Sequence, residues 1–99
     1  MNTQELGRGA LRQWRWKNDH AEVGGQGACL VLALQCVSDL RSDDPIFTAI
    51  RKHLGLEPVA DRDPTDYWAL ARWYDNLPPA EQDSRAREVF QALADGRIT

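Results

Sequence analysis

The chain has 99 residues, of which 42% are hydrophobic and 27% are charged, and it contains four tryptophans. This length fits a single domain with its own hydrophobic core, and the composition excludes a disordered chain. The formal net charge of −3, from fifteen acidic residues against twelve Lys and Arg, argues against a general binder of nucleic acid or of anionic membranes.

The first predicted helix begins at Thr3, a residue type that can cap a helix start. Its apolar positions recur every three or four residues, as on one face of a helix: Leu6, Ala10 or Leu11, and Trp14. Gly7 and Gly9 lower the helix propensity of this segment. We expect Trp14 in the core.

From Trp16 to Gly27 the sequence becomes polar and rich in glycine. The pairs Asn18-Asp19 and Gly24-Gly25 are typical of turns. Two interpretations stay open, a long loop or a short hairpin between residues 16 and 27. We favour the loop.

The next segment is almost uniformly apolar, at nine of the ten positions from Ala28 to Val37. A membrane span needs about 20 apolar residues, so this run is too short to be one. We predict a central helix at about residues 28–40, buried on nearly every side. An aspartate at Leu32 or Leu34 would then unfold the domain, because it would bury an unpaired charge.

Two further helices have clear start signals. Asp44 before Pro45 is typical of an N-cap followed by proline in the first turn, and Gly55 is a suitable end. Asp63-Pro64 repeats this start signal before a helix at residues 65–76. Between these helices, residues 56–63 carry Pro58 and alternating charges, which favour a solvated connection.

A last helix follows Leu77-Pro78-Pro79, with Asp83 or Ser84 as its cap and Gly96 at its end. The sequence therefore predicts an all-α fold, a single compact domain over residues 1–99 with four or five helices around the central one. Residues 1–5 show no start of a signal peptide, so we expect a cytoplasmic protein.

Several short motifs together resemble an uncharacterised family of small helical domains from actinobacteria and their phages. They are the tryptophans of residues 14–16, Gly27-Ala28-Cys29-Leu30 leading into Ala33-Leu34, and Arg72-Trp73 with Asp75 ahead of Pro78, Ser84 and Val89. The resemblance spans about residues 10–94. It implies a helical fold and a source, but no activity.

Residues for catalysis or metal binding are few. Cys29 with a histidine could form a thiol-dependent enzyme or sensor, but an apolar run buries a thiol and raises its pKa, so we favour a structural cysteine. His20, Cys29, Cys36 and His53 lack the close pair spacing of a zinc site. We expect no catalytic residues, no metal and no cofactor.

A basic stripe runs along the first helix, where Arg8, Arg12 and Arg15 are spaced to share one face beside Trp16. Such a stripe could grip phosphates or an acidic protein. The alternative is a solvated face whose arginines pair with the acids of the chain.

The helix at residues 65–76 is rich in aromatic residues. Trp68 and Trp73 lie five positions apart, about 140° around a helix, so we do not expect both to be fully buried. Asp75 follows them before the proline turn. Exposed tryptophan beside arginine is typical of interface centres. The leading hypothesis is a non-catalytic protein-binding module that acts on a host protein or self-associates as a dimer. A nucleic-acid binder is the alternative, although we do not expect nucleic acid as the partner. We expect no membrane partner.

Overall fold

The computed structural model describes residues 2–20 and 30–98, and for residues 15–20 it describes the backbone alone. These ranges contain five helices and no strand: α1 (Thr3–His20), α2 (Leu30–Val37), α3 (Pro45–Leu54), α4 (Thr65–Asn76) and α5 (Pro79–Ala94). The all-α prediction is therefore confirmed.

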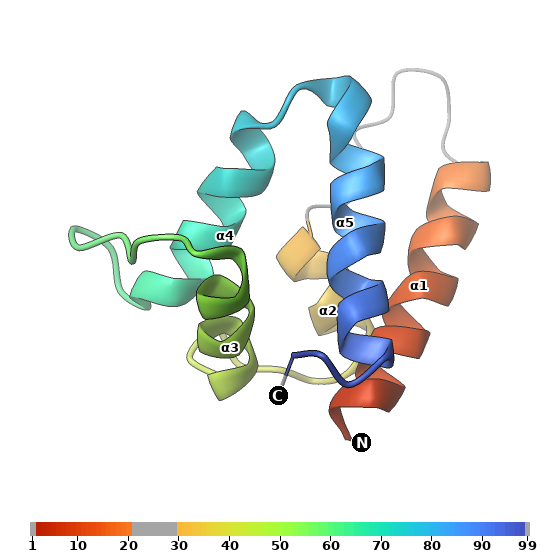
Figure 1. The fold of residues 1–99 in the computed structure, drawn as a ribbon, viewed down its shortest axis with the longest axis horizontal. Coiled ribbons are helices and arrows are strands. Elements are labelled where there is room, and N and C mark those ends of the chain that lie inside the picture. Colours follow the sequence, from red (N-terminus) through yellow and green to blue (C-terminus); the bar gives the residue numbers. More distant parts are fainter. Residues whose placement is uncertain (1, 21–29, 99) are drawn as a thin grey trace.

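The helices pack around one core (Figure 1). Helix α1 lies along α5 and also contacts α2, α3 packs on α4, and α2 contacts α4. The radius of gyration of the Cα atoms is 12.7 Å, close to the value of about 13 Å expected for a compact domain of this length. The single compact domain predicted from the sequence is what the chain forms.

Trp14 joins three helices at the centre of this core. Its ring meets Tyr74 of α4 at 5.9 Å and Phe90 of α5 at 5.7 Å between centroids, both edge to face. Edge-to-face pairs of this kind add about 0.5–1.5 kcal/mol to the area they bury. The buried position predicted for Trp14 is thus confirmed.

The two glycines of α1 mark the points where it approaches its neighbours most closely. A Cβ on Gly7 would lie 2.4 Å from the backbone nitrogen of Ala94 and 2.7 Å from the carbonyl oxygen of Phe90. A Cβ on Gly9 would lie 2.6 Å from Cγ1 of Val37. The residues that lower helix propensity are those that let α1 pack against α5 and α2.

The two ends of α1 differ from the prediction. Asn2, one residue before Thr3, caps the start, because its Oδ1 accepts a hydrogen bond of 2.8 Å from the backbone N–H of Glu5. The helix then continues to His20, so a loop or hairpin starting at Trp16 is wrong for residues 16–20. Residues 21–27 lie outside the described residues.

Helix α2 is shorter and less buried than the predicted helix at 28–40. It begins at Leu30 in the described part of the chain and ends at Val37. Leu34 is fully buried, but Leu32 is 50% exposed and Cys36 is exposed. The prediction that this helix is buried on nearly every side was wrong. Helices α1 and α4 cover two sides of α2, and the side that carries Leu32 faces outward.

Helix α3 has the predicted ends. Oδ1 of Asp44 accepts a hydrogen bond of 2.9 Å from the backbone N–H of Ile46, and Pro45 stands in the first turn. Gly55 has φ 71°, a left-handed conformation that glycine adopts without a Cβ penalty. Local sequence signals were sufficient for this element.

Helix α4 spans the predicted residues, but the start signals of α4 and α5 differ from those expected. Pro64 itself is the N-cap of α4, with no side-chain capping bond, so the role predicted for Asp63 is wrong. Helix α5 begins at Pro79 rather than near Asp83 or Ser84, because a proline fits the first turn, where no N–H is needed. Gly96, at φ 76°, follows its end as predicted.

Candidate functional site

A groove lies between α4 and the segment that follows α3. Its volume is about 540 Å³, and Trp73 on α4 lines it, with residues 56–61 along the other wall. We call it the Trp73 groove. Its apolar lining comes from both walls: Leu56, Pro58, Val59, Ala69, Trp73 and Leu77.

A second hollow adjoins this groove. It has a volume of about 290 Å³ and is lined by Trp68, Ala71, Asp75 and Arg62. We call it the Trp68 hollow. Arg72 and Asn76 line both depressions, so these two residues form the ridge between them. Three of the sequence candidates, Trp68, Trp73 and Asp75, thus lie on one surface, and both tryptophans are partly buried there.

The wall at residues 56–61 is held in place by hydrogen bonds from both neighbouring helices. The backbone N–H of Val59 donates to the carbonyl oxygen of Thr65 at 3.2 Å, and the side chain of Val59 is buried. Arg51 of α3 donates to the carbonyl oxygen of Leu56 at 2.6 Å. Because these bonds fix the wall relative to α4, the groove does not depend on a partner to form it.

Arg51 also pairs with Asp66 in the first turn of α4. The Oγ1 of Thr48 donates to the other carboxylate oxygen of Asp66 at 2.5 Å. The side chains of Arg51 and Asp66 are only 16% and 23% exposed, so water screens this pair less than a surface pair. The cluster locks α3 to α4 beneath the groove wall.

Trp68 is covered on one face by a guanidinium group. Arg62 Cζ lies 4.8 Å above the centroid of the Trp68 ring, and Tyr67 meets the same ring edge to face at 5.4 Å. A cation over an indole at an exposed site contributes about 0.5–1 kcal/mol. This stacking orients Arg62 along the surface beside the hollow.

The charged side chains around the two depressions lack ionic partners within the described part of the chain. The five are exposed, and none forms an ion pair there: Glu57, Asp61, Arg62, Arg72 and Asp75. Five other arginines each pair with a carboxylate: Arg41, Arg51, Arg85, Arg87 and Arg97. Asp75 therefore does not pair with Arg72, and this surface has charge left for another molecule.

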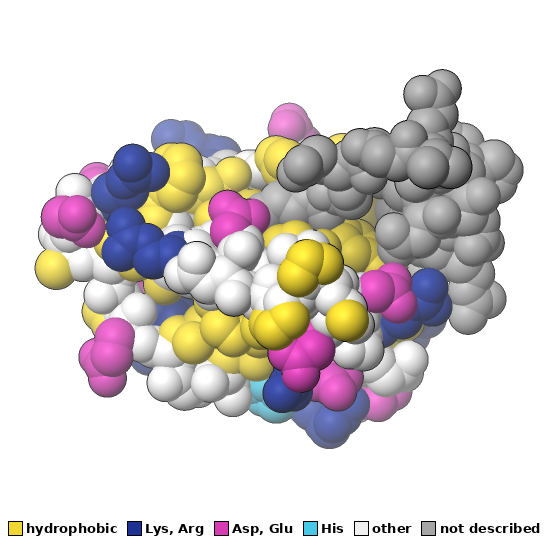
Figure 2. Space-filling view, turned by 90° about the horizontal axis from the view of Figure 1, so that it is seen from above, with side chains coloured by type: hydrophobic (Ala, Val, Ile, Leu, Met, Phe, Trp, Pro, Cys, Tyr) yellow, Lys and Arg dark blue, Asp and Glu magenta, His cyan; other side chains and the backbone are white. Residues whose placement is uncertain are grey.

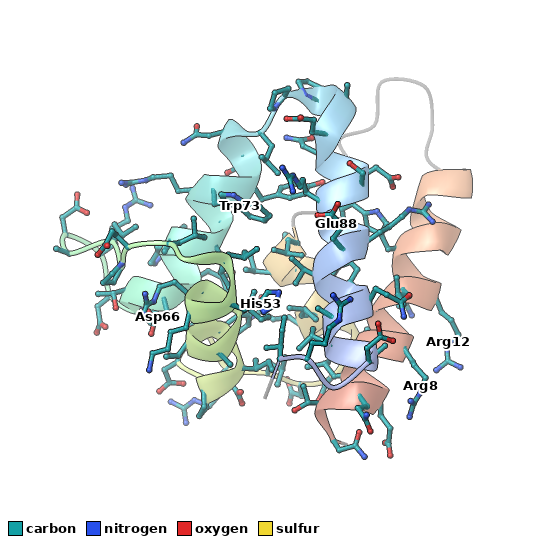
Figure 3. The ribbon with its side chains drawn as sticks, viewed as in Figure 1. Arg8, Arg12, His53, Asp66, Trp73 and Glu88 are labelled. Carbon is teal, nitrogen blue, oxygen red and sulfur yellow. The ribbon has the colours of Figure 1, made fainter. Side chains whose placement is uncertain are left out.

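The basic stripe lies elsewhere. Arg8 and Arg12 are exposed on α1, and Figure 3 shows them extending outward on the far side of the molecule from α4 and Trp73. Neither pairs with a carboxylate of residues 2–14 or 30–98. The side chains of Arg15 and Trp16 lie outside the described residues. The described candidates therefore fall into two separate surfaces.

Figure 2 shows how side-chain types are distributed over one face of the domain. Basic, acidic and hydrophobic side chains interleave at the end of the molecule away from the undescribed residues. Stacking, apolar contact and ion pairing are what such a mixed surface can offer.

The remaining chemical candidates contribute little. Cys29 lies outside the described residues. Among the described side chains, those of residues 2–14 and 30–98, no group of three or more from His, Cys, Asp or Glu could hold a metal ion. In residues 2–20 and 30–98, no helix is both long and apolar enough to span a membrane.

The sequence analysis did not predict two parts of the candidate surface. The segment 56–63 was expected to be a solvated connection, whereas Val59 is buried and the segment forms a groove wall. Arg62 was not singled out, although it stacks on Trp68. A lone valine between Pro58 and charged residues was the signal that this segment packs on the domain.

Comparison with known proteins gives no relative to guide the assignment: no family model, curated protein or solved structure matches the chain.

Proposed function

We propose that this domain is a non-catalytic protein-binding module, and that the Trp73 groove and the Trp68 hollow form its docking surface. The observation that carries the proposal is the pairing of two partly buried tryptophans with exposed charged side chains that lack ionic partners in the described chain. Tryptophan and arginine are the residues most enriched where truncation weakens protein interfaces.

The layout of the surface also suits a protein partner. Apolar side chains line the groove, and Glu57, Asp61 and Arg72 stand around it. Interfaces between proteins combine a dry apolar centre with a polar rim in this way. An apolar side chain of the partner would enter the groove beside Trp73, while charged groups at its edges would pair with the rim.

The biological setting is part of the same proposal. The resemblance of residues 10–94 to small helical domains of actinobacteria and their phages supports an accessory protein that works in the cytoplasm. Such a protein would act on a host protein or on a second copy of itself.

The test is capture of partners from an actinobacterial lysate on the immobilised wild-type domain and on two charge-reversal variants. Arg72→Glu changes the docking surface, and Arg8→Glu makes the same change at an exposed arginine on α1. Mass spectrometry should identify proteins that the wild type and Arg8→Glu retain and Arg72→Glu loses. If the two variants retain the same proteins as the wild type, the docking surface is wrongly placed.

A second candidate function uses the other surface. Arg8 and Arg12 are exposed, lie one helical turn apart and have no carboxylate partner within the described residues, so they could contact successive phosphates of a nucleic acid. Binding through two phosphate contacts would weaken with salt at a log–log slope of about −1.8. Titration of duplex DNA at low and moderate salt tests this, with Arg8→Glu/Arg12→Glu as the variant that should lose binding.

A further inference from the structure

The charged residues that line the Trp73 groove are divided between its two walls. Both acids, Glu57 and Asp61, lie on the segment 56–61, and the one basic residue, Arg72, lies on α4. Both acids are exposed, and neither forms an ion pair in the described part of the chain. The wall at residues 56–61 therefore presents two carboxylates with which a cation from another molecule can pair.

The two arginines closest to this wall along the chain are engaged elsewhere. Arg62 follows Asp61 directly, but its Cζ lies 4.8 Å above the centroid of the Trp68 ring, and it lines the Trp68 hollow rather than the groove. Arg51 bonds to the main chain of the wall and pairs with Asp66 of α4. Neither guanidinium group neutralises the two carboxylates.

The same wall leaves main-chain groups available to a partner. Val59 ties it to the domain, because its N–H donates to the carbonyl oxygen of Thr65 and its own carbonyl oxygen accepts from the N–H of Arg62. Glu57 and Ala60, before and after Val59, are exposed, and no hydrogen bond within the described residues engages their main-chain groups. An extended peptide needs such partners, whereas a helix pairs its main chain internally.

The α4 wall supplies hydrogen-bond donors. Arg72 and Asn76 lie one helical turn apart, and both line the groove. No hydrogen bond or ion pair to the described part of the chain occupies either side chain. Guanidinium and amide N–H groups donate to carbonyl oxygens, whereas a carboxylate only accepts. The variant Arg72→Glu would therefore lose this kind of contact with a bound main chain.

We propose that the Trp73 groove binds an extended, basic segment of a partner protein. This inference rests on the proposed function and names the chemistry of the partner. An apolar side chain of the segment packs on Trp73, and a lysine or arginine beside it pairs with Glu57 and Asp61. Carbonyl oxygens of its main chain accept hydrogen bonds from Arg72 and Asn76. The groove volume of about 540 Å³ lies within the range of about 300–1,000 Å³ for ligand pockets, which suits a few residues rather than a whole helix.

Selection from a displayed library of random linear peptides on the immobilised full chain tests the proposal. Peptides enriched on the wild type should combine an apolar residue with an adjacent lysine or arginine. Glu57→Gln/Asp61→Asn removes both carboxylates with little change in shape, so selection on this variant should lose the preference for basic residues. The matched control, Asp39→Asn/Glu81→Gln, removes two exposed carboxylates that do not line the groove and should select the same peptides as the wild type.

Calorimetric titration of one selected peptide measures the two kinds of contact. Glu57→Gln/Asp61→Asn should weaken its binding by about fivefold at low salt, because exposed ion pairs contribute modestly, and by less at high salt, which screens them. A second peptide carries an ester in place of the amide next to its apolar residue, so it lacks one N–H. It should bind about threefold more weakly to the wild type. Circular dichroism of each variant checks that its helix content is unchanged.

The outcomes separate the two proposals. Selection of acidic peptides, or of none, overturns the basic segment, and so does a control that loses the basic preference as the groove variant does. An ester peptide that binds as well as the amide overturns the main-chain contacts. If the basic segment falls but lysate capture still depends on Arg72, the docking surface stands and its partner has another chemistry. If neither selection nor capture depends on the groove residues, both proposals fall.

Discussion

The indole Nε1 of Trp14 donates a hydrogen bond of 2.8 Å to Oδ1 of Asp83, which lies 69 residues later in the chain on α5. Trp14 is buried, so its N–H cannot donate a hydrogen bond to bulk water instead. The same carboxylate accepts from Nε of Arg87 at 3.0 Å, one turn further along α5. Asp83 thus connects the buried ring of α1 to the exposed face of α5 and fixes how the two helices align.

Replacing Asp83 by alanine should lower the free energy of unfolding by about 1–3 kcal/mol, because a buried donor loses its acceptor. Arg87→Ala removes only the ion pair on the surface of α5 and should cost about 0.5 kcal/mol or less. Chemical denaturation of both variants measures the difference. In a Trp14→Phe background, which has no indole N–H, Asp83→Ala should cost less than it does in the wild type. Equal losses from Asp83→Ala in both backgrounds would mean that the bond contributes nothing.

Gly7→Ala should destabilise the domain by about 1–3 kcal/mol, the usual cost of overpacking, even though alanine is favoured over glycine within a helix by about 1 kcal/mol. The new methyl group would meet the backbone of α5, which cannot rotate away. Gly9→Ala meets only the side chain of Val37, which can move, and should cost less. Thermal unfolding of the two variants ranks them, and a Gly7→Ala protein that melts above the wild type would contradict the packing of α1 on α5.

Leu32→Asp should leave the fold intact, with a change in stability of about 1 kcal/mol or less, because half of this side chain already contacts water. Leu34→Asp, two residues away on the same helix, should unfold the domain, since Leu34 is 0% exposed and the charge would have no partner. Circular dichroism with thermal melting distinguishes the two. Loss of folding in both variants would restore the expectation of a helix buried on every side.

Asp66→Ala should cost about 1–3 kcal/mol, because it leaves the guanidinium of Arg51 partly buried without its carboxylate. The matched control is Asp43→Ala, which breaks an ion pair with Arg41 whose side chains are 67% and 86% exposed. Water surrounds both side chains of that pair, so it should contribute about 0–1 kcal/mol. Urea unfolding at low salt compares them, and equal effects would show that the α3–α4 cluster is no stronger than a surface contact.

The sequence predicted those elements whose ends depend on local chemistry. The helix Pro45–Leu54 has its N-cap, its proline and its left-handed glycine within a few residues of its ends, and each signal acts without tertiary context. The end of α1 and the start of α5 were misplaced because their terminal turns carry no strong apolar pattern. Gly7 and Gly9 counted against a helix, whereas packing against other helices requires them there.

Part of the candidate surface could also be predicted from local sequence patterns. The spacing of Trp68 and Trp73 was enough to show that one helix could not bury both, and both are partly exposed. The groove beside Trp73 depends on Val59 and on the bond from Arg51 to Leu56, which hold a segment that is neither helix nor strand against the domain. No helical or strand periodicity in the sequence encodes such contacts. The prediction that Leu32 is buried was wrong, because an apolar run does not show which side of the helix lacks a packing neighbour.

The packing of α1 along α5 also determines when the domain can fold during synthesis. The apolar face of α1, with Leu6, Ala10 and Trp14, needs α5 as its cover, and α5 leaves the ribosome after α1 to α4. Until α5 is synthesised, the core formed by α1 to α4 is exposed on one side. Exposed apolar surface of this kind is prone to aggregate or to bind a chaperone. A nascent chain arrested before Pro79 should therefore be protease-sensitive, and release of the remaining residues should convert it in one cooperative step.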